Sequence, residues 1–271
     1  MGSDAVTAVL TSRAVITVEG DDWRDFLQGL LTQDVSSLEP KEIRFAALLS
    51  PQGRLLFDLF VVGTAAGCFI DCAAHHRAAL IERLTLYRLR AKAEILTSPV
   101  QPVGLLFPVA PPEGWLRDPR LPSLGYRGYA ATPPPGATEA EETVFDRLRI
   151  SLGVPGPADW GSDKTYPIEA NFDLLMGIDF QKGCFVGQET TSRMKRRGAI
   201  KSRMATIVFD GAPPDHGAEL LAGGLRAGEA LSGVEGMAMA LLRLDRLKGG
   251  PLQMSDGRAW APRLPDWLPA P

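Results

Sequence analysis

Cysteine, net charge and long apolar runs are all scarce in this 271-residue sequence. Its three cysteines cannot all pair, which argues against a disulfide scaffold and favours a reducing, cytoplasmic setting. No apolar run approaches the about 20 residues of a membrane span, and the N-terminus lacks a basic segment followed by a long apolar one. The formal charge of −3 gives no overall attraction to nucleic acid or anionic lipid. We therefore expect a cytoplasmic protein without membrane contact, whose basic surfaces are local.

Several well-known catalytic motifs are also missing. The sequence has no Walker-type or dinucleotide-type glycine loop, no HExxH and no nucleophile elbow. It does have an ordinary globular composition, with 45% apolar and 23% charged residues. The length suits two or three compact domains.

Apolar spacing in the first 100 residues predicts helices and antiparallel strands. Asp21 and Asp22 precede an apolar face with helical spacing that runs from Trp23 to Leu31. Residues 44–63 read as two strands joined by the turn SPQG, and CFIDC as a further strand. An amphipathic helix is predicted over residues 75–89, with Leu80 and Leu84 facing inward.

The rest of the chain predicts a second mixed unit and then a β-rich one. Ten prolines between Pro99 and Pro135 predict mostly turns, with one short strand in GLLFPVA. Thr138 and Glu141 form a capping box that would start a helix. Beyond residue 202, short apolar runs with frequent glycine indicate a small β-domain. We predict an α+β fold of largely antiparallel units, with domains at residues 1–100, 101–201 and 202–271.

Two cysteines lie near two histidines, an arrangement that resembles a metal site. On a strand, Cys68 and Cys72 would lie about 13 Å apart, at about 3.3 Å per residue. Zinc needs each sulfur at about 2.3 Å, so one ion could not bind both. The sequence therefore predicts two buried thiols, followed by His75 and His76 at the start of a helix, and no metal site.

The stretch QKGCFVGQET places Cys184 between two glycines and ahead of a predicted helix over residues 188–197. A nearby Lys182 and the helix N-terminus would both favour a reactive thiolate, and the glycines would let a ligand approach the backbone. The alternative is a tight turn around an inert buried cysteine, which is the more common situation.

Basic residues concentrate in the same region. Seven lysines and arginines and one acid, Glu189, occur between residues 182 and 203. A solvated helix end is the usual explanation. A local site for a carboxylate tail, a phosphate or RNA is the sharper one, although interleaved aromatic residues that would stack on RNA are missing.

Asp58, in GRLLFDLF, is a carboxylate within an apolar strand. In apolar surroundings it could take part in proton transfer. On an alternating strand it could equally point to solvent, and the sequence does not decide between these.

The segment KGCFVGQE resembles the signature of the YgfZ family of folate-binding proteins, which are relatives of the glycine-cleavage aminomethyltransferase. The similarity continues in order along most of the chain, in these segments: DFLQGLLTQDV, LLSPQGRLLFDLFV, LRISLGVP and PIEANFDLL. The resemblance implies three domains in a ring around a channel that binds a reduced folate. It also implies a role in assembly or repair of iron–sulfur proteins, including tRNA-modifying enzymes, with Cys184 as the hallmark residue.

Two departures separate this chain from the transferring relatives. They resemble it around residues 53–62 but carry two adjacent acids where it has Phe57 and Asp58, and a folate-contacting glutamate where it has Ser151. Acid–base chemistry needs a group within reach of the proton, and only Asp58 remains nearby. The resemblance therefore implies a folate-binding accessory protein, with a tetrahydrofolate-dependent aminomethyl transferase as the alternative.

The expected ligand is tetrahydrofolate or a derivative, bound in an apolar slot formed by residues 55–62. Polar groups of Glu169 or Asn171 would meet the pterin, and basic side chains would meet the anionic glutamate tail. The candidate catalytic residues are Cys184 and Asp58. The candidate folate-contacting residues are Lys182, Gly183, Gly187, Gln188, Glu189, Glu169, Asn171 and Arg193.

A conventional cluster usually needs four cysteine ligands, so three cysteines cannot hold one alone. The expected partners are therefore iron–sulfur client or assembly proteins, with RNA as a further option. Cys184 could act by sharing a cluster, by redox exchange or by contact with a client.

Overall fold

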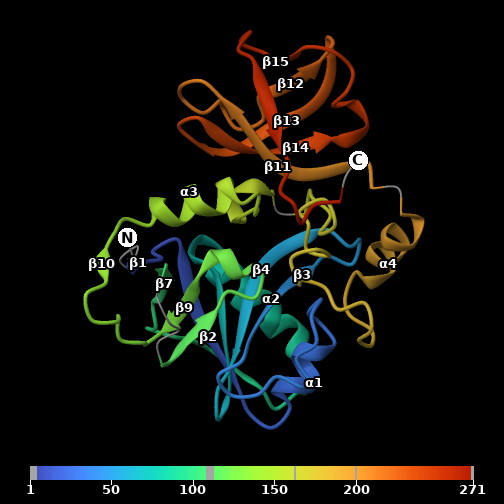
Figure 1. Cartoon of the computed structure of the whole chain (residues 1–271). Helices are drawn as coiled ribbons and strands as arrows, with labels where there is room; N and C mark the ends of the chain where they lie inside the picture. The colour runs from blue at the N-terminus through green and yellow to red at the C-terminus, as the bar shows by residue number, and fades with distance from the viewer. Residues whose placement is uncertain (1–4, 108–112, 162, 199, 270–271) are drawn as a thin grey trace.

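The computed structural model describes residues 5–107, 113–161, 163–198 and 200–269. Three β-sheets form the framework, with the C-terminal sheet stacked on the two others (Figure 1). The predicted α+β class is confirmed. All strand pairs are antiparallel except the one between the short strands β1 and β10.

The first sheet provides most of the hydrophobic core. Its strands, in spatial order, are β3 (Ile43–Leu49), β4 (Leu55–Gly63), β5 (Gly67–Ala73), β2 (Arg13–Glu19) and β6 (Glu94–Thr97). Helices α1 (Trp23–Gln28) and α2 (Arg77–Arg88) pack on one face. The other face packs against Trp160 and Phe172. These residues precede the loop of residues 181–187, which we call the Cys184 loop. Strand β4 is therefore buried on both faces, as its nearly continuous apolar sequence requires.

The SPQG turn between β3 and β4 forms as predicted, with the Gly53 amide donating to the Ser50 carbonyl at 2.8 Å. Helix α1 is shorter than its apolar pattern. The Asp22 carboxylate does not cap it, because it accepts from the Lys92 amide instead. Leu30 and Leu31 lie beyond the helix but are still buried.

The proline-rich segment lies mostly outside regular structure, as predicted, but it contributes three short strands to a second sheet where one was expected. The strand predicted in GLLFPVA forms over residues 104–106, while residues 108–110 lie outside the described ranges. This sheet has the order β10 (Thr138–Glu139), β1 (Val6–Val9), β7 (Pro102–Leu106), β9 (Tyr126–Tyr129) and β8 (Trp115–Arg117). The prolines that the structure describes in this segment begin a strand or lie between strands, where a missing amide donor breaks no ladder hydrogen bond. Strand β1 pairs with β7 and β10, so the chain crosses the boundary predicted at residue 100.

The helix predicted to start at Thr138 does form, but its predicted start is wrong. Thr138 pairs with Val6 in the sheet and cannot cap a helix, and α3 begins only at Thr143 and ends at Ser151. Helix α4 spans Gln188–Arg197, the predicted range.

The C-terminal domain is a six-stranded sheet that almost closes on itself, which confirms the predicted barrel-like domain. Its order is β15 (Leu252–Met254), β12 (Glu219–Ala222), β13 (Leu225–Val234), β14 (Met237–Arg243), β11 (Ser202–Phe209) and β16 (Trp260–Arg263). A bridge between Gln253 and Ala259 brings the two outer strands together. Among the helices that the structure describes, none combines the length and apolar character of a bilayer span.

Candidate functional site

The Cys184 loop packs against the turn between β3 and β4. Gly187 has a φ of +80°, and a Cβ there would lie 2.7 Å from the Ser50 carbonyl oxygen. Gly53, in the turn, has a φ of +82°, and a Cβ there would lie 2.8 Å from the Thr190 Cβ and 3.0 Å from the Gly187 carbonyl oxygen. Both glycines are thus needed for close approach of two backbones. Cys184 is left exposed on the outer side of this contact.

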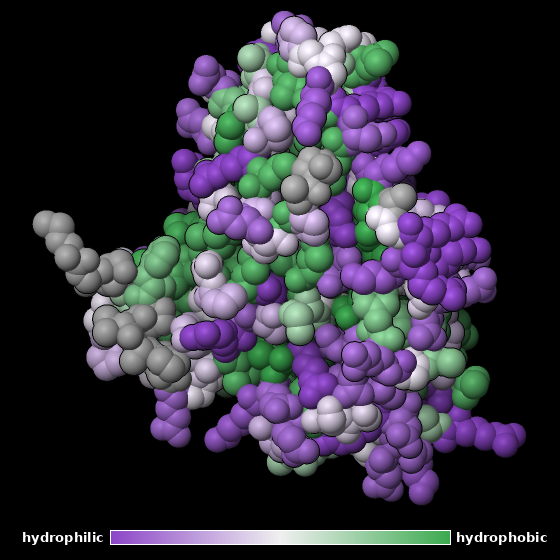
Figure 2. Space-filling model, turned by 45° about the vertical axis from the view of Figure 1, so that its right-hand side comes forward, coloured by the Kyte–Doolittle hydropathy of each residue, from purple (hydrophilic) through white to green (hydrophobic). Residues whose placement is uncertain are grey.

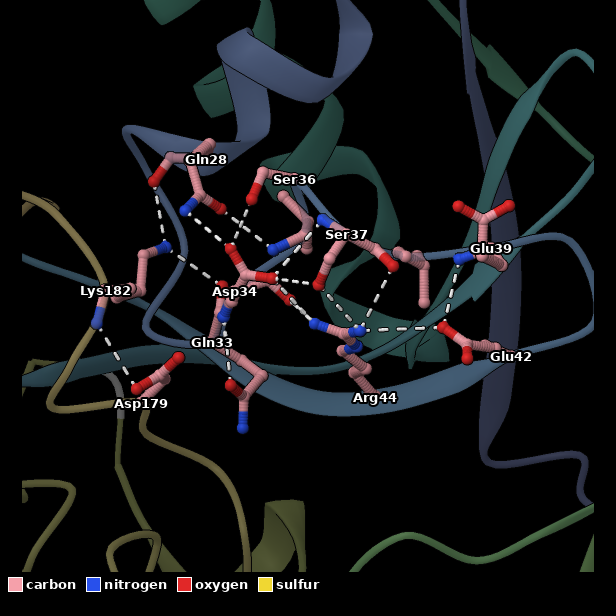
Figure 3. A network of polar contacts seen from close by, with 12 residues as sticks. Gln28, Gln33, Asp34, Ser36, Ser37, Glu39, Glu42, Arg44, Asp179 and Lys182 are labelled. Atoms are coloured by element: carbon pink, nitrogen blue, oxygen red, sulfur yellow. Dashed lines mark hydrogen bonds and ion pairs between the residues drawn. The ribbon is translucent and has the colours of Figure 1, made fainter.

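Lys182 fastens the same loop to the segment after α1 (Figure 3). Its ammonium donates to the carbonyl oxygens of Gln28 at 2.9 Å, Leu31 at 2.7 Å and Gln33 at 2.9 Å. Burial lowers the pKa of Lys182 to about 8, so the ammonium is still the main form at pH 7. All three donors are used, and the predicted contact between Lys182 and a folate tail therefore does not fit.

The segment that receives Lys182 is itself held by Asp34 (Figure 3). The Asp34 carboxylate pairs with Arg44 at 2.8 Å and accepts hydrogen bonds from Gln28, Ser36 and Ser37. Burial would raise the pKa of Asp34, but these hydrogen bonds outweigh it and hold the pKa well below its usual range. The Cys184 loop is consequently fixed to a preorganised support.

Two predicted folate-contacting residues have other partners. Asn171 is fully buried; its Nδ2 donates to the Met204 carbonyl at 2.7 Å and its Oδ1 accepts from Arg203. Glu169 accepts from the Tyr166 amide at 3.0 Å, and burial raises its pKa. The Asn171 contacts hold strand β11 against the preceding loop, and the Glu169 contact lies within that loop, so both side chains already have protein partners.

The remaining motif residues lie at the surface around α4. Gln188 opens the helix, while Glu189 is exposed and lies 4.0 Å from Arg193. Gly183 has open space around it. None of these residues lines the cleft described below, so the Arg193 site predicted for a folate tail is separate from it.

Cys184 is the accessible thiol of the chain. Cys68 and Cys72 are buried on β5, as predicted, and burial raises the pKa of Cys72 to about 12 and that of Cys68 further. Within the described ranges, no group of three or more metal-ligating side chains could hold an ion.

Asp58 lies away from the Cys184 loop, in a buried network of alternating charges that joins the first two sheets. Its Oδ2 lies 2.6 Å from Arg13 Nη1, and Arg13 Nε lies 2.6 Å from Asp71. Arg127 then connects Asp71 to Asp118, each at 3.0 Å, and Arg120 also pairs with Asp118. We call these residues the charged cluster: Arg13, Asp58, Asp71, Asp118, Arg120 and Arg127.

Neither expectation for Asp58 describes this arrangement. The side chain does not point to solvent, being 2% exposed, and its surroundings are not apolar. Sequence reasoning missed the cluster, although its signal was present: Arg13, Asp71 and Arg127 are charges placed within short apolar strands.

A cleft opens beside the charged cluster. It has a volume of about 540 Å³ with its open mouth included, and its lining includes Asp58, Phe60, Arg120 and Phe145. Asp58 Oδ1 is buried and has no hydrogen-bond partner among the described residues. An orphaned carboxylate oxygen beside aromatic rings suits a flat ligand that carries N–H donors.

Comparison with known proteins shows which folds and families this chain is similar to. Residues 201–270 match the family model described as the C-terminal beta-barrel domain of CAF17. The crystal structure of the glycine cleavage system aminomethyltransferase T from Bartonella henselae superposes with a TM-score of 0.77, covering 98% of this chain and 87% of that one, at 16% identity. This similarity confirms the predicted aminomethyltransferase-like fold.

Several sequence relatives are named iron–sulfur cluster assembly factors. The human "Iron-sulfur cluster assembly factor IBA57, mitochondrial" is 29% identical over 303 residues, covering 96% of this chain and 84% of the relative. The IBA57 homolog of Pyricularia oryzae is 30% identical over 284 residues, covering 87% and 71%. Both are named mitochondrial, which overturns the expectation of a cytoplasmic protein. The narrower resemblance to YgfZ stays a prediction.

Proposed function

Because the chain belongs to the IBA57 family of iron–sulfur cluster assembly factors, we propose that it supports assembly or repair of iron–sulfur clusters in client enzymes, tRNA-modifying ones among them. One observation carries the proposal: Cys184 is exposed on a loop fixed by Lys182 and Gly187. Thiolates are the usual cluster ligands. With Cys68 and Cys72 buried, this chain offers one ligand, and the others would come from a partner.

Replacing the thiol tests this part. Cys184→Ser should reduce the activity of cluster-dependent enzymes at least about tenfold in human cells that lack IBA57 and express this chain in mitochondria. The melting temperature should not change, because the side chain is exposed and supports no packing. Gln181→Ser, at an exposed position of the same loop, is the matched control. Full rescue by Cys184→Ser would contradict the proposal.

The second part of the proposal is that the cleft beside Asp58 binds a reduced folate. A pterin carries ring and amino N–H groups, which would donate to Asp58 Oδ1, the oxygen without a partner. Phe60 and Phe145 offer aromatic surface, and Arg120 a cation for an anionic group. The folate would supply one-carbon chemistry when bound, while the charged cluster binds and orients it.

Calorimetric titration with anaerobic tetrahydrofolate tests the cleft. Asp58→Asn should weaken binding by about tenfold or more, since it replaces an acceptor oxygen without removing volume. Cys184→Ser and Arg193→Gln should bind like the wild type, because neither residue lines the cleft. The absence of binding to the wild type, or equal affinity in Asp58→Asn, would contradict this site.

A further inference from the structure

A concentration of exposed basic side chains lies on α4 and shortly after it. Arg193, Lys195, Arg196, Arg197 and Lys201 are all exposed. Figure 2 shows hydrophilic residues gathered over this helix, on the side that the view brings forward. We call these five residues the basic face.

Few acids neutralise the basic face. Glu189 lies 4.0 Å from Arg193, and both side chains are more than half exposed, so solvent screens the pair. Lys195 reaches buried Asp173 at 3.6 Å. Arg196 and Arg197 form no ion pair with any described residue. Lys201 forms none either, so Arg196, Arg197 and Lys201 are available to a partner.

The helix presents these cations on a rigid support. Thr191 is fully buried, and Met194 packs against the apolar cluster that contains Trp160 and Phe172, so the inner side of α4 is fixed. Gly198 ends the helix in the left-handed conformation, with a φ of +66°. Rigid display reduces the side-chain and backbone entropy that a partner would otherwise have to remove on binding.

The basic face adjoins the Cys184 loop, which leads directly into α4. Met176 adds an exposed apolar side chain, 61% accessible, and its carbonyl accepts from Gln33, the residue whose own carbonyl binds Lys182. The same part of the structure thus carries an exposed thiol, an exposed methionine and several arginines. Methionine and arginine are enriched in protein interfaces.

We infer that the basic face and the Cys184 loop form a docking surface for an acidic protein that exchanges the cluster at Cys184; the inference rests on the function proposed above. Residues 182–203 carry seven cations and one acid in a chain whose net charge is −3, so the remainder of the chain is acidic. An acidic partner is attracted to the basic face and repelled elsewhere. The field therefore orients the encounter toward the thiol.

Protein fits this surface better than RNA does. Single-stranded RNA binds by stacking on exposed aromatic rings. Phe185, in the Cys184 loop, is buried, and Phe180 is partly buried with the Lys195 ammonium 5.3 Å from its ring centre. The basic face therefore offers cations without a stacking platform.

Charge reversal tests the inference in the same cells. The triple variant R193E/R196E/R197E should lower the activity of cluster-dependent enzymes at least about tenfold, with an unchanged melting temperature. The control R77E/R90E/K92E makes the same change of charge at three exposed positions on and after α2, and should rescue like the wild type. Suppressors of the triple variant should replace Asp or Glu by Lys or Arg in an iron–sulfur protein.

The outcomes separate the two proposals. If the wild-type chain itself fails to rescue, the proposed function fails and the docking surface with it. Rescue by the wild type and equally by the triple variant overturns the docking surface alone. Fluorescently labelled total tRNA serves as a second probe: micromolar, salt-sensitive binding that the triple variant loses would assign the basic face to RNA and overturn the inference.

Discussion

At the scale of single residues, Lys182 shows how the chain holds its reactive group. The lysine stands two positions before Cys184, which suggested an electrostatic effect on the thiol or on a ligand. Its ammonium instead donates to three carbonyl oxygens, one at the last residue of α1 and two just after it. The effect on Cys184 is therefore one of position.

Lys182→Met should lower the free energy of unfolding by about 2–3 kcal/mol, because it leaves three partly buried carbonyls without their donor. It should also speed alkylation of Cys184 by iodoacetamide, since the loop loses its anchor. Urea titration and timed alkylation measure the two effects. The control Lys201→Met, at an exposed position, should change neither. A slower or unchanged alkylation rate would argue against the anchoring role.

The burial of Cys68 and Cys72 agrees with the strand pattern. The exposure of Cys184 excludes the buried cysteine that the sequence offered as the more common alternative. The partners of Lys182 could not be predicted, because they lie about 150 positions earlier in the chain. The contact predicted between Asn171 and folate was misjudged for the same reason. The Asn171 carboxamide binds Met204 and Arg203, which reach it only when the C-terminal domain packs.

At the scale of elements, patterns confined to one segment were predicted well. Helix α4 has its acid in the first turn and three cations in the last, and its bounds agree with these signals. The capping box at Thr138 was misleading because Thr138 has a better partner in β1. Local chemistry was outweighed there by a strand 132 positions away.

The packing of the Cys184 loop on the β3–β4 turn depends on Gly187. Gly187→Ala should lower the free energy of unfolding by about 1–3 kcal/mol, because a Cβ would lie 2.7 Å from the Ser50 oxygen and φ is +80°. Gly183→Ala, four positions earlier, meets open space and should be nearly neutral. Equal stability of the two variants in chemical denaturation would contradict this account.

At the scale of the whole molecule, the charged cluster joins the first two sheets. Burial would raise the pKa of Asp118, but Arg120 and Arg127 outweigh it and hold the pKa at about 2, below the ordinary 3.8. Because the pKa of Asp118 is lower in the folded chain than in the unfolded one, ionised Asp118 stabilises the fold above about pH 4. This stabilisation is lost as the pH falls toward 2. The contribution is roughly 2 kcal/mol.

Asp118→Asn should therefore lower the free energy of unfolding at pH 7 by about 3 kcal/mol, because two buried guanidinium groups lose a charged partner. Between pH 4 and 2 its stability should fall less steeply than that of the wild type. Urea titrations across this range measure the slopes. Asp256→Asn, at an exposed carboxylate, serves as the control. Parallel slopes for Asp118→Asn and the wild type would refute the assignment.

The cluster itself could not be assembled from the sequence. Four members are visible as charges within strands, and Asp118 and Arg120 follow a strand, but which charges meet is decided by how two sheets face one another. The aminomethyltransferase-like architecture, by contrast, was predictable because its signature segments recur in order along most of the chain.

The crossing of β1 into the second sheet has a consequence for how the protein is made. Residues 6–9 leave the ribosome early, yet their pairing partners are residues 103–106 and 138–139. Contacts this distant in sequence form late, since a long loop must close first. Strand β1 is therefore made well before either of its pairing partners, and it stays unpaired until residues 103–106 have followed it.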